Sequence, residues 1–240
     1  MSHGLEPLIE VKNLSFKYSD AKVLDGASLA INDKEFCLFV GPNGGGKTTL
    51  IKLFMGLFHP QTGEVLINKA HPAKFRTKIG YVPQALQFDP QFPISVGEFV
   101  MLGATSKLTW YGKRPKFVKE KAKYLLDKVD LSSYFTSPFS SLSGGQKQRA
   151  TLVRALIDEP EILLFDEPIN NLDARSGEIF YKIIDENLGK KTIVMITHFV
   201  GDLFEKADKI YVINGNIREI SKEKACCHYP LGLYHLHSDE

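Results

Sequence analysis

The chain has 240 residues, enough for one large domain with a substantial hydrophobic core or for two small ones. Lysine and arginine number 30 against 28 acidic residues, so the formal charge of +2 gives no electrostatic reason to expect nucleic acid as a partner. No apolar run reaches the roughly 20 residues that a membrane-spanning helix needs. The three cysteines suggest no disulfide framework, and we expect a reducing, cytoplasmic location.

The first part of the chain is expected to be rich in strands. Short apolar and alternating runs predict strands at residues 8–11, 15–18, 28–31 and 36–40. The last of these runs is continuously apolar, as expected for a strand buried on both faces. Helical spacing follows at residues 47–57, where one apolar face is expected from Leu50, Leu53, Phe54 and Leu57.

The remainder alternates strands with helices. Strands are predicted at residues 63–68, 79–82, 162–165 and 192–197, and a hairpin turn centred on Asn-Gly lies within residues 213–217. Helices are predicted at residues 115–130, 145–158 and 174–188. In the first of these helices the side chains expected to face inward are Phe117, Leu125, Leu126 and Val129. This order predicts a parallel α/β core that carries a mainly helical insertion at about residues 84–150.

The segment after the apolar strand fits the phosphate-binding pattern G-x-x-x-x-G-K-[ST] at every fixed position. It comprises Gly41, Pro42, Asn43, Gly44, Gly45, Gly46, Lys47, Thr48 and Thr49. Backbone N–H groups at the start of a helix surround a phosphate, and glycines allow the backbone to approach it. Lys47 would contact the β- and γ-phosphates, and the Thr48 hydroxyl suits Mg²⁺. The strand before and the helix after favour a nucleoside triphosphate site over a chance glycine-rich turn.

A second apolar strand ends in two carboxylates, Asp166 and Glu167, in the form of a Walker B motif. Asp166 would hold Mg²⁺ through its water shell, and Glu167 would polarise the attacking water as a general base. Two adjacent acids can also simply end a strand at the surface. Their position downstream of a matched phosphate loop favours the catalytic interpretation.

The segment Leu142, Ser143, Gly144, Gly145 and Gln146 resembles the signature of the ATP-binding cassette (ABC) family, which the chain resembles from about residue 8 to residue 222. In that family this segment of one subunit caps the ATP held by another. The Ser143 hydroxyl, the backbone amides of the two glycines and the following helix N-terminus suit a γ-phosphate. The chain departs from the common pattern at Gly45, more often Ala or Ser, and at Thr48, often Ser; both residues are compatible with binding.

Four more positions acquire roles from this resemblance. Gln84 resembles the glutamine that contacts Mg²⁺ and water, and His198 resembles the switch histidine at the γ-phosphate. Asp173 resembles an aspartate at the dimer seam, and Tyr18 resembles the aromatic residue that stacks on adenine. Considered one at a time, each residue also has an ordinary structural interpretation: a solvated glutamine, a histidine at a strand end, a helix-capping aspartate and a core tyrosine.

The resemblance implies an α/β fold with a P-loop NTPase core of mainly parallel sheet and flanking helices. To this core it adds an N-terminal antiparallel β subdomain and an α-helical signature subdomain, all within one ATPase domain at residues 1–225. It further implies ATP and Mg²⁺ as cofactors and a head-to-tail homodimer. Partners would be integral-membrane permease subunits and, indirectly, a substrate-binding protein. The location would be cytoplasmic and peripheral, on the inner face of the cell membrane.

The transported substrate is suggested by residues 79–103, which resemble the same stretch of cassettes that serve zinc, manganese and iron importers. We therefore expect a subunit that hydrolyses ATP to import a divalent transition metal. The alternatives are an ABC ATPase of iron–sulfur cluster assembly and an importer subunit for another substrate. DNA-repair ATPases insert long coiled coils that this chain lacks, and ribosome-associated cassette factors carry two cassettes.

The last fifteen residues are rich in metal-ligating side chains. Residues 226–240 contain Cys226, Cys227, His228, His235, His237 and Asp239. These side chains could bind Zn²⁺ or a similar ion. Their spacing matches no closed structural zinc site, so a solvated terminus with accidental histidines is the favoured interpretation.

Overall fold

The computed structural model describes residues 6–86, 88–89, 91–106, 115–169, 172–197 and 202–222. The chain divides into two compact units, one made of residues 1–76 and 192–240 and the other of residues 77–191. His198 and the residues predicted for the tail metal site, 226–237, lie outside the described residues.

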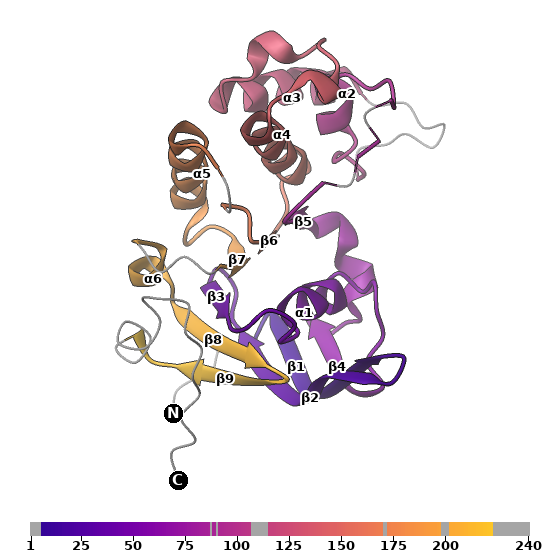
Figure 1. Cartoon of the computed structure of the whole chain (residues 1–240), viewed down its shortest axis with the longest axis vertical. Coiled ribbons are helices and arrows are strands. Elements are labelled where there is room, and N and C mark those ends of the chain that lie inside the picture. Colours follow the sequence, from indigo (N-terminus) through magenta and orange to yellow (C-terminus); the bar gives the residue numbers. More distant parts are fainter. Residues whose placement is uncertain are drawn as a thin grey trace. The chain divides into compact units, whose positions relative to one another are not determined.

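The first unit contains two sheets and the helices that accompany them (Figure 1). Its antiparallel sheet has the order β2–β1–β4, formed by β2 (Ala21–Ile31), β1 (Ile9–Tyr18) and β4 (Thr62–Ile67). Its second sheet places β3 (Phe36–Val40) between β7 (Thr192–Ile196) and β8 (Lys209–Asn214), all parallel, with β9 (Asn216–Ile220) antiparallel to β8. The helices are α1 (Lys47–Phe54) and α6 (Asp202–Lys206), and a 3-10 segment spans Pro72–Lys78.

The described part of the second unit contains a parallel strand pair and four α-helices. The strands are β5 (Ile79–Val82) and β6 (Ile162–Asp166). The helices are α2 (Val96–Met101), α3 (Lys116–Lys128), α4 (Gly144–Leu156) and α5 (Ala174–Asn187), with short 3-10 turns at Ser132–Tyr134 and Phe139–Ser141. Within this unit α4 contacts α2, α3, α5 and β5, so it is the central helix (Figure 1).

The predicted buried strands are confirmed. Every residue of β3, β6 and β7 is buried, because parallel strands covered on both faces carry apolar side chains at consecutive positions. The antiparallel N-terminal sheet and the Gly215 hairpin between β8 and β9 are also confirmed. Aromatic rings fill both cores. Phe39 packs edge-on against Phe54 in the first unit, and Phe99 stacks on Phe139 in the second. Fully burying a phenylalanine contributes about 1.5–3 kcal/mol.

Two predicted apolar faces are wrong in detail. Leu57 was expected on the buried face of the helix at 47–57, but it is 54% exposed because α1 ends at Phe54. The helix stops there because Gly56 has a φ of 62° and the Arg76 guanidinium donates hydrogen bonds to the carbonyls of Met55 and Gly56. Phe117 was expected to face inward and is 55% exposed, because the buried face of α3 consists of Val118, Ala122 and Leu126.

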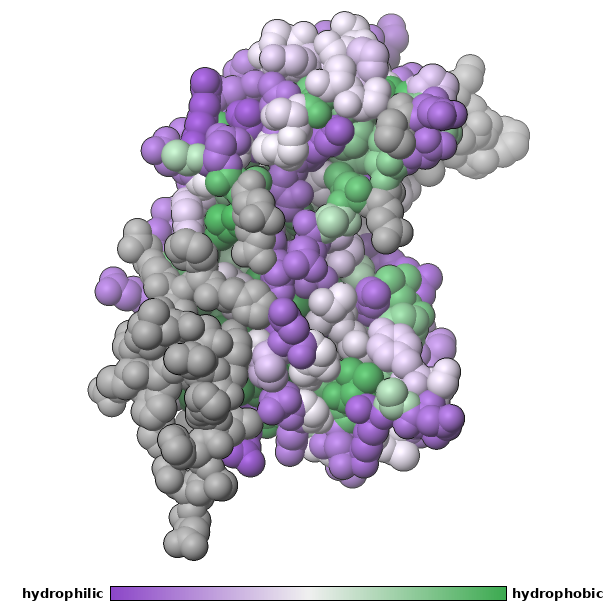
Figure 2. All heavy atoms as spheres, viewed as in Figure 1, coloured by the Kyte–Doolittle hydropathy of each residue, from purple (hydrophilic) through white to green (hydrophobic). Residues whose placement is uncertain are grey.

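Among the described residues visible in Figure 2, hydrophilic and hydrophobic side chains alternate in small areas. The large hydrophobic side chains that are exposed include Tyr18, Leu57, Phe92, Leu102, Phe117 and Tyr124. Among the described residues, no helix combines the length and the hydrophobicity needed to span a bilayer.

Candidate functional site: a phosphate loop and a pair of carboxylates

The phosphate loop in the first unit connects buried β3 to α1. Gly41, Gly44 and Gly46 have φ values of 142°, 79° and 104°, a range that side-chain-bearing residues rarely adopt. Gly46 is the N-cap of α1, and no side chain caps this end of the helix. The first turn of an α-helix presents backbone N–H groups and a partial positive charge. The loop therefore has the conformation of an anion-binding helix start.

The glycines of this loop also pack against the protein itself. A Cβ atom at Gly41 would lie 2.1 Å from the carbonyl oxygen of Ile213, and one at Gly45 would lie 2.6 Å from the same atom. At Gly46 a Cβ would lie 2.8 Å from Leu24 Cδ2. The N–H of Gly215 donates to the carbonyl of Gly45 at 3.0 Å. The β8–β9 turn and β2 therefore support the loop from behind.

Lys47 folds back onto the loop. Its Nζ donates to the carbonyl oxygens of Gly41 and Pro42, each at 2.8 Å, and the residue is only 5% exposed. Thr49 is buried on the same first turn, and its Oγ1 lies 3.4 Å from the Tyr18 hydroxyl. The structure thus brings the predicted loop residues together within one unit.

Tyr18 ends β1 beside this loop. The residue is 42% exposed, and its ring makes T-shaped contacts with Phe16 and Phe58 at centroid distances of 5.0 and 5.5 Å. A tyrosine that is 42% exposed has part of its surface open to a stacking partner. The predicted stacking of Tyr18 on adenine stays a prediction that this geometry permits.

The predicted carboxylates lie in the second unit, at the end of β6. Asp166 is the last residue of the strand and is 3% exposed. The hydroxyl of Tyr81, on the neighbouring strand β5, donates to Asp166 Oδ2 at 3.4 Å. Burial and the nearby carboxylate raise the pKa of Tyr81, so its hydroxyl keeps the proton that it donates.

Glu167 follows directly and has an unusual backbone. Its φ is 49°, in the left-handed region that costs a non-glycine residue about 1–2 kcal/mol. Its Oε2 accepts a hydrogen bond from Gln84 Nε2 at 2.6 Å. Two predicted catalytic residues are therefore in contact, and one holds a strained backbone of the kind that clusters at functional sites.

The signature segment forms the N-terminus of α4. Ser143 is the N-cap, its Oγ accepts from the Gln146 N–H at 3.3 Å, and Gln146 Oε1 accepts from the Ser143 N–H at 2.8 Å. This reciprocal pair is a capping box, which explains the Ser-x-x-Gln spacing locally. A Cβ at Gly144 would meet nothing within 4 Å, so this glycine borders open space.

Asp173 lies next to the signature segment of the same chain. A Cβ at Gly145 would lie 2.4 Å from Asp173 Oδ2 and 2.6 Å from Ser176 Oγ. Asp173 is the N-cap of α5 and accepts hydrogen bonds from the Ser176 N–H and hydroxyl. These bonds from Ser176 lower the pKa of the Asp173 carboxyl. The capping interpretation of Asp173 is thereby confirmed, and its role at a dimer seam stays a prediction.

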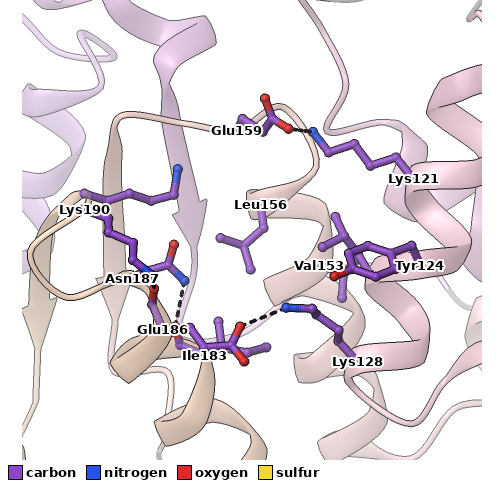
Figure 3. A pocket seen from close by; sticks show the side chains of 12 residues that line it. Lys121, Tyr124, Lys128, Val153, Leu156, Glu159, Ile183, Glu186, Asn187 and Lys190 are labelled. Carbon is purple, nitrogen blue, oxygen red and sulfur yellow. Dashed lines mark hydrogen bonds and ion pairs between the residues drawn. The ribbon is translucent and has the colours of Figure 1, made fainter.

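A pocket of about 480 Å³ lies between α3, α4 and α5 in the second unit (Figure 3). Ion pairs cross its rim, between Lys121 and Glu159 at 2.6 Å and between Lys128 and Glu186 at 3.0 Å. Lysines near the C-terminal ends of helices are stabilised by the helix dipole. The described lining contains none of the motif residues, so this pocket is separate from the candidate nucleotide site.

Sequence reasoning assigned no role to two residues that contact the site. These residues are Tyr81, which donates to Asp166, and Gln148 on α4. Gln148 Nε2 lies within hydrogen-bonding distance of the carbonyls of Pro83 and Pro168. Spacing along the chain gives no signal for such contacts, because they join positions 65 and 20 residues apart.

Comparison with known proteins decides the family. Residues 24–170 match the family model described as ABC transporter. The chain belongs to the ABC transporter family. A metal transport system ATP-binding protein of Chlamydia pneumoniae is 36% identical, over 92% of this chain and 94% of its own length. The zinc transport system ATP-binding protein of Streptococcus pneumoniae is 34% identical, over 84% of this chain and 87% of its own length.

Solved structures agree with this assignment. A dimeric ATP-binding cassette in a post-hydrolysis state, bound to ADP and phosphate, matches with a TM-score of 0.77. It is 27% identical, and the match covers 89% of this chain and 98% of that chain. The expected P-loop NTPase fold is confirmed, and the chain is an ABC ATPase that binds ATP.

Proposed function

We propose that this cassette hydrolyses ATP to power the import of a divalent transition metal, such as zinc, through a separate permease. The observation that carries this proposal is its similarity, over 92% of its length, to an ATP-binding protein of a metal transport system. The zinc transport relative supports the same substrate class. The cassette would supply energy and not choose the ion, since the metal passes through the permease.

The motif residues would divide the chemistry between them. Lys47 would neutralise charge on the β- and γ-phosphates, and Glu167 would take a proton from the attacking water. Gln84 and His198 would contact the water and the γ-phosphate. Asp166, Thr48 and Gln84 offer oxygen atoms, which are the ligands that Mg²⁺ prefers, and the nearly buried Asp166 carboxylate suits such an ion. When bound, Mg²⁺ would neutralise phosphate charge.

The active form would be a head-to-tail homodimer in which the signature segment of one copy caps the ATP of the other. The N-terminus of α4 carries the dipole for this role, and the open space beside Gly144 leaves room for a phosphate. Asp173 would lie at the seam between the copies.

The membrane partner would contact the second unit near Gln84. Phe92, eight residues after Gln84 in the chain, is exposed and makes a T-shaped contact with Phe88, which packs on the stacked pair Phe99 and Phe139. Aromatic residues, phenylalanine included, are enriched in protein–protein interfaces, so this exposed ring is a candidate contact for the permease. The cassette would thus be peripheral on the inner face of the cell membrane, and a substrate-binding protein would deliver the metal.

Transport in a reconstituted system tests this proposal. The cassette and its co-purified permease would be placed in vesicles with the cassette exposed to Mg-ATP. Uptake of Zn²⁺, Mn²⁺ or Fe²⁺ that requires ATP supports metal import. Uptake of an organic solute in place of any metal would assign another substrate, and co-purification with soluble scaffold proteins instead of a permease would favour iron–sulfur cluster assembly.

A further inference from the structure

One side chain in the second unit touches both segments that carry the predicted catalytic pair. Gln148 lies on the second turn of α4, and its Nε2 is 3.5 Å from the carbonyl oxygen of Pro83 and 3.2 Å from that of Pro168. Pro83 directly precedes Gln84, and Pro168 directly follows Glu167. The Gln148 amide therefore bridges the two chain segments that meet at the Gln84–Glu167 hydrogen bond.

The chemistry of this contact requires a side chain that can donate two hydrogen bonds. Both partners are carbonyl oxygens, which only accept hydrogen bonds, and the amide nitrogen of glutamine has two N–H groups. A glutamate of the same size has no donor at neutral pH and would place a negative charge against two carbonyls. The glutamine at position 148 thus supplies the donors that the two carbonyl oxygens need.

Gln148 contacts Pro83 and Pro168 beyond the point where the hydrogen bonds between β5 and β6 end. The parallel pairing of β5 with β6 ends at Val82 opposite Phe165, so Gln84 and Glu167 both lie two residues past the last pair. The left-handed φ of Glu167 is also unfavourable unless its surroundings hold it. Gln148 supplies hydrogen bonds at this point, one residue from each catalytic side chain.

We propose that Gln148 is a positioning residue for ATP hydrolysis, which acts by holding Pro83 and Pro168 so that Gln84 and Glu167 keep their contact. Gln148 lies on α4, whose N-terminus carries the signature segment. It therefore also connects the signature helix to the segment that carries Glu167, the proposed general base. This inference rests on the proposed role of Glu167 as general base.

The test compares Gln148→Glu and Gln148→Met with wild type in the full-length cassette. Both variants remove the donors, and the second does so without adding charge. We expect kcat to fall roughly 10- to 100-fold, since small displacements of reacting groups cost this much. The KM for ATP and the measured ATP affinity should stay within about threefold, since a positioning effect of this kind acts on the chemical step. Gln148→Arg, which restores N–H donors, should recover part of kcat.

A merely structural role predicts a different pattern. In that case the variants would lower the melting temperature while kcat, measured well below it, stayed within about twofold of wild type, and the proposal would be overturned. In the background of Glu167→Gln, the change Gln148→Met should cause no further loss, because the base is already removed. Wild-type activity in the single variant Glu167→Gln would overturn the role of Glu167 as general base. Wild-type activity in the Gln148 variants, with Glu167→Gln inactive, would overturn only the positioning role of Gln148.

Discussion

Gln84 and Glu167 are joined by a hydrogen bond of 2.6 Å, although 83 residues separate them in the chain. Gln84 follows β5 and Glu167 follows β6, and the parallel pairing of these strands brings both side chains to the same sheet edge. The contact means that the carboxylate proposed as general base is engaged by an amide donor in this structure.

Glu167→Gln should lower turnover strongly while ATP binding persists. The glutamine keeps an oxygen that can accept from Gln84 but cannot take a proton from water, so we expect kcat to fall by roughly 10²–10⁴-fold. Phosphate release measures turnover, and gel filtration with ATP should show an accumulated dimer. Hydrolysis near the wild-type rate would remove Glu167 from its proposed role.

Lys47→Ala should weaken nucleotide binding itself. The lysine is buried in the loop, and hydrogen bonds from a charged group contribute about 1.5–3 kcal/mol, so ATP affinity should fall at least about tenfold. Lys52→Gln, on the last turn of the same helix, is the matched control and should stay within about threefold of wild type. Equal affinities of the two variants, measured by equilibrium binding, would show that Lys47 does not contact the phosphates.

Gly41→Ala and Gly44→Ala distinguish two effects on the stability of the phosphate loop: steric overlap with β8 and strain of the backbone. A Cβ at Gly41 meets the Ile213 carbonyl at 2.1 Å, so overpacking and strain should lower the free energy of unfolding by about 2–4 kcal/mol. At Gly44 the φ is also positive but no atom lies within 4 Å, so the cost should be about 1–2 kcal/mol. Urea denaturation measures both, and the reverse order would contradict the support of this loop by β8.

Gly145→Ala and Gly144→Ala make a similar pair in the signature segment. The new Cβ at position 145 would push the side chains of Asp173 and Ser176 out of their capping hydrogen bonds, so we expect about 0.5–2 kcal/mol of lost stability. At position 144 the added methyl group enters open space, so stability should hold, whereas ATP-dependent dimerisation and kcat should fall. Unchanged ATPase activity in Gly144→Ala would argue against a phosphate beside this glycine.

Asp173 should make the stability of the cassette sensitive to acid. Its pKa lies below the ordinary value of 3.8, because Ser176 donates to the carboxylate through its N–H and hydroxyl. A lowered carboxyl pKa contributes stability that is complete above the unfolded-state pKa and is lost as pH falls through the folded-state pKa. Asp173→Asn retains a helix cap without titrating. In denaturation from pH 7 to pH 2.5, wild type should lose more stability than Asp173→Asn below about pH 4; parallel curves would contradict this.

Sequence patterns predicted the elements with strong local signals and misplaced those that depend on neighbours. The continuous apolar runs of β3, β6 and β7 have few alternatives to a buried parallel strand. Leu57 and Phe117 were wrongly predicted to be buried. Helical periodicity does not show where a helix ends or which of its faces packs against the core. The end of α1 depends on Arg76, which lies 21 residues after Met55, whose carbonyl it binds.

For the site, the sequence by itself determined the chemical groups: a glycine loop with Lys47, two carboxylates on a buried strand, and a serine-led helix start. These are local patterns, because each is made of consecutive residues whose conformation follows from their own types. Only the tertiary structure decided which groups touch, including Gln84 with Glu167, Gly145 with Asp173 and Gln148 with two proline carbonyls. Such contacts arise from strand pairing and helix packing, which depend on the whole core. The spacing of the residues along the chain therefore does not indicate them.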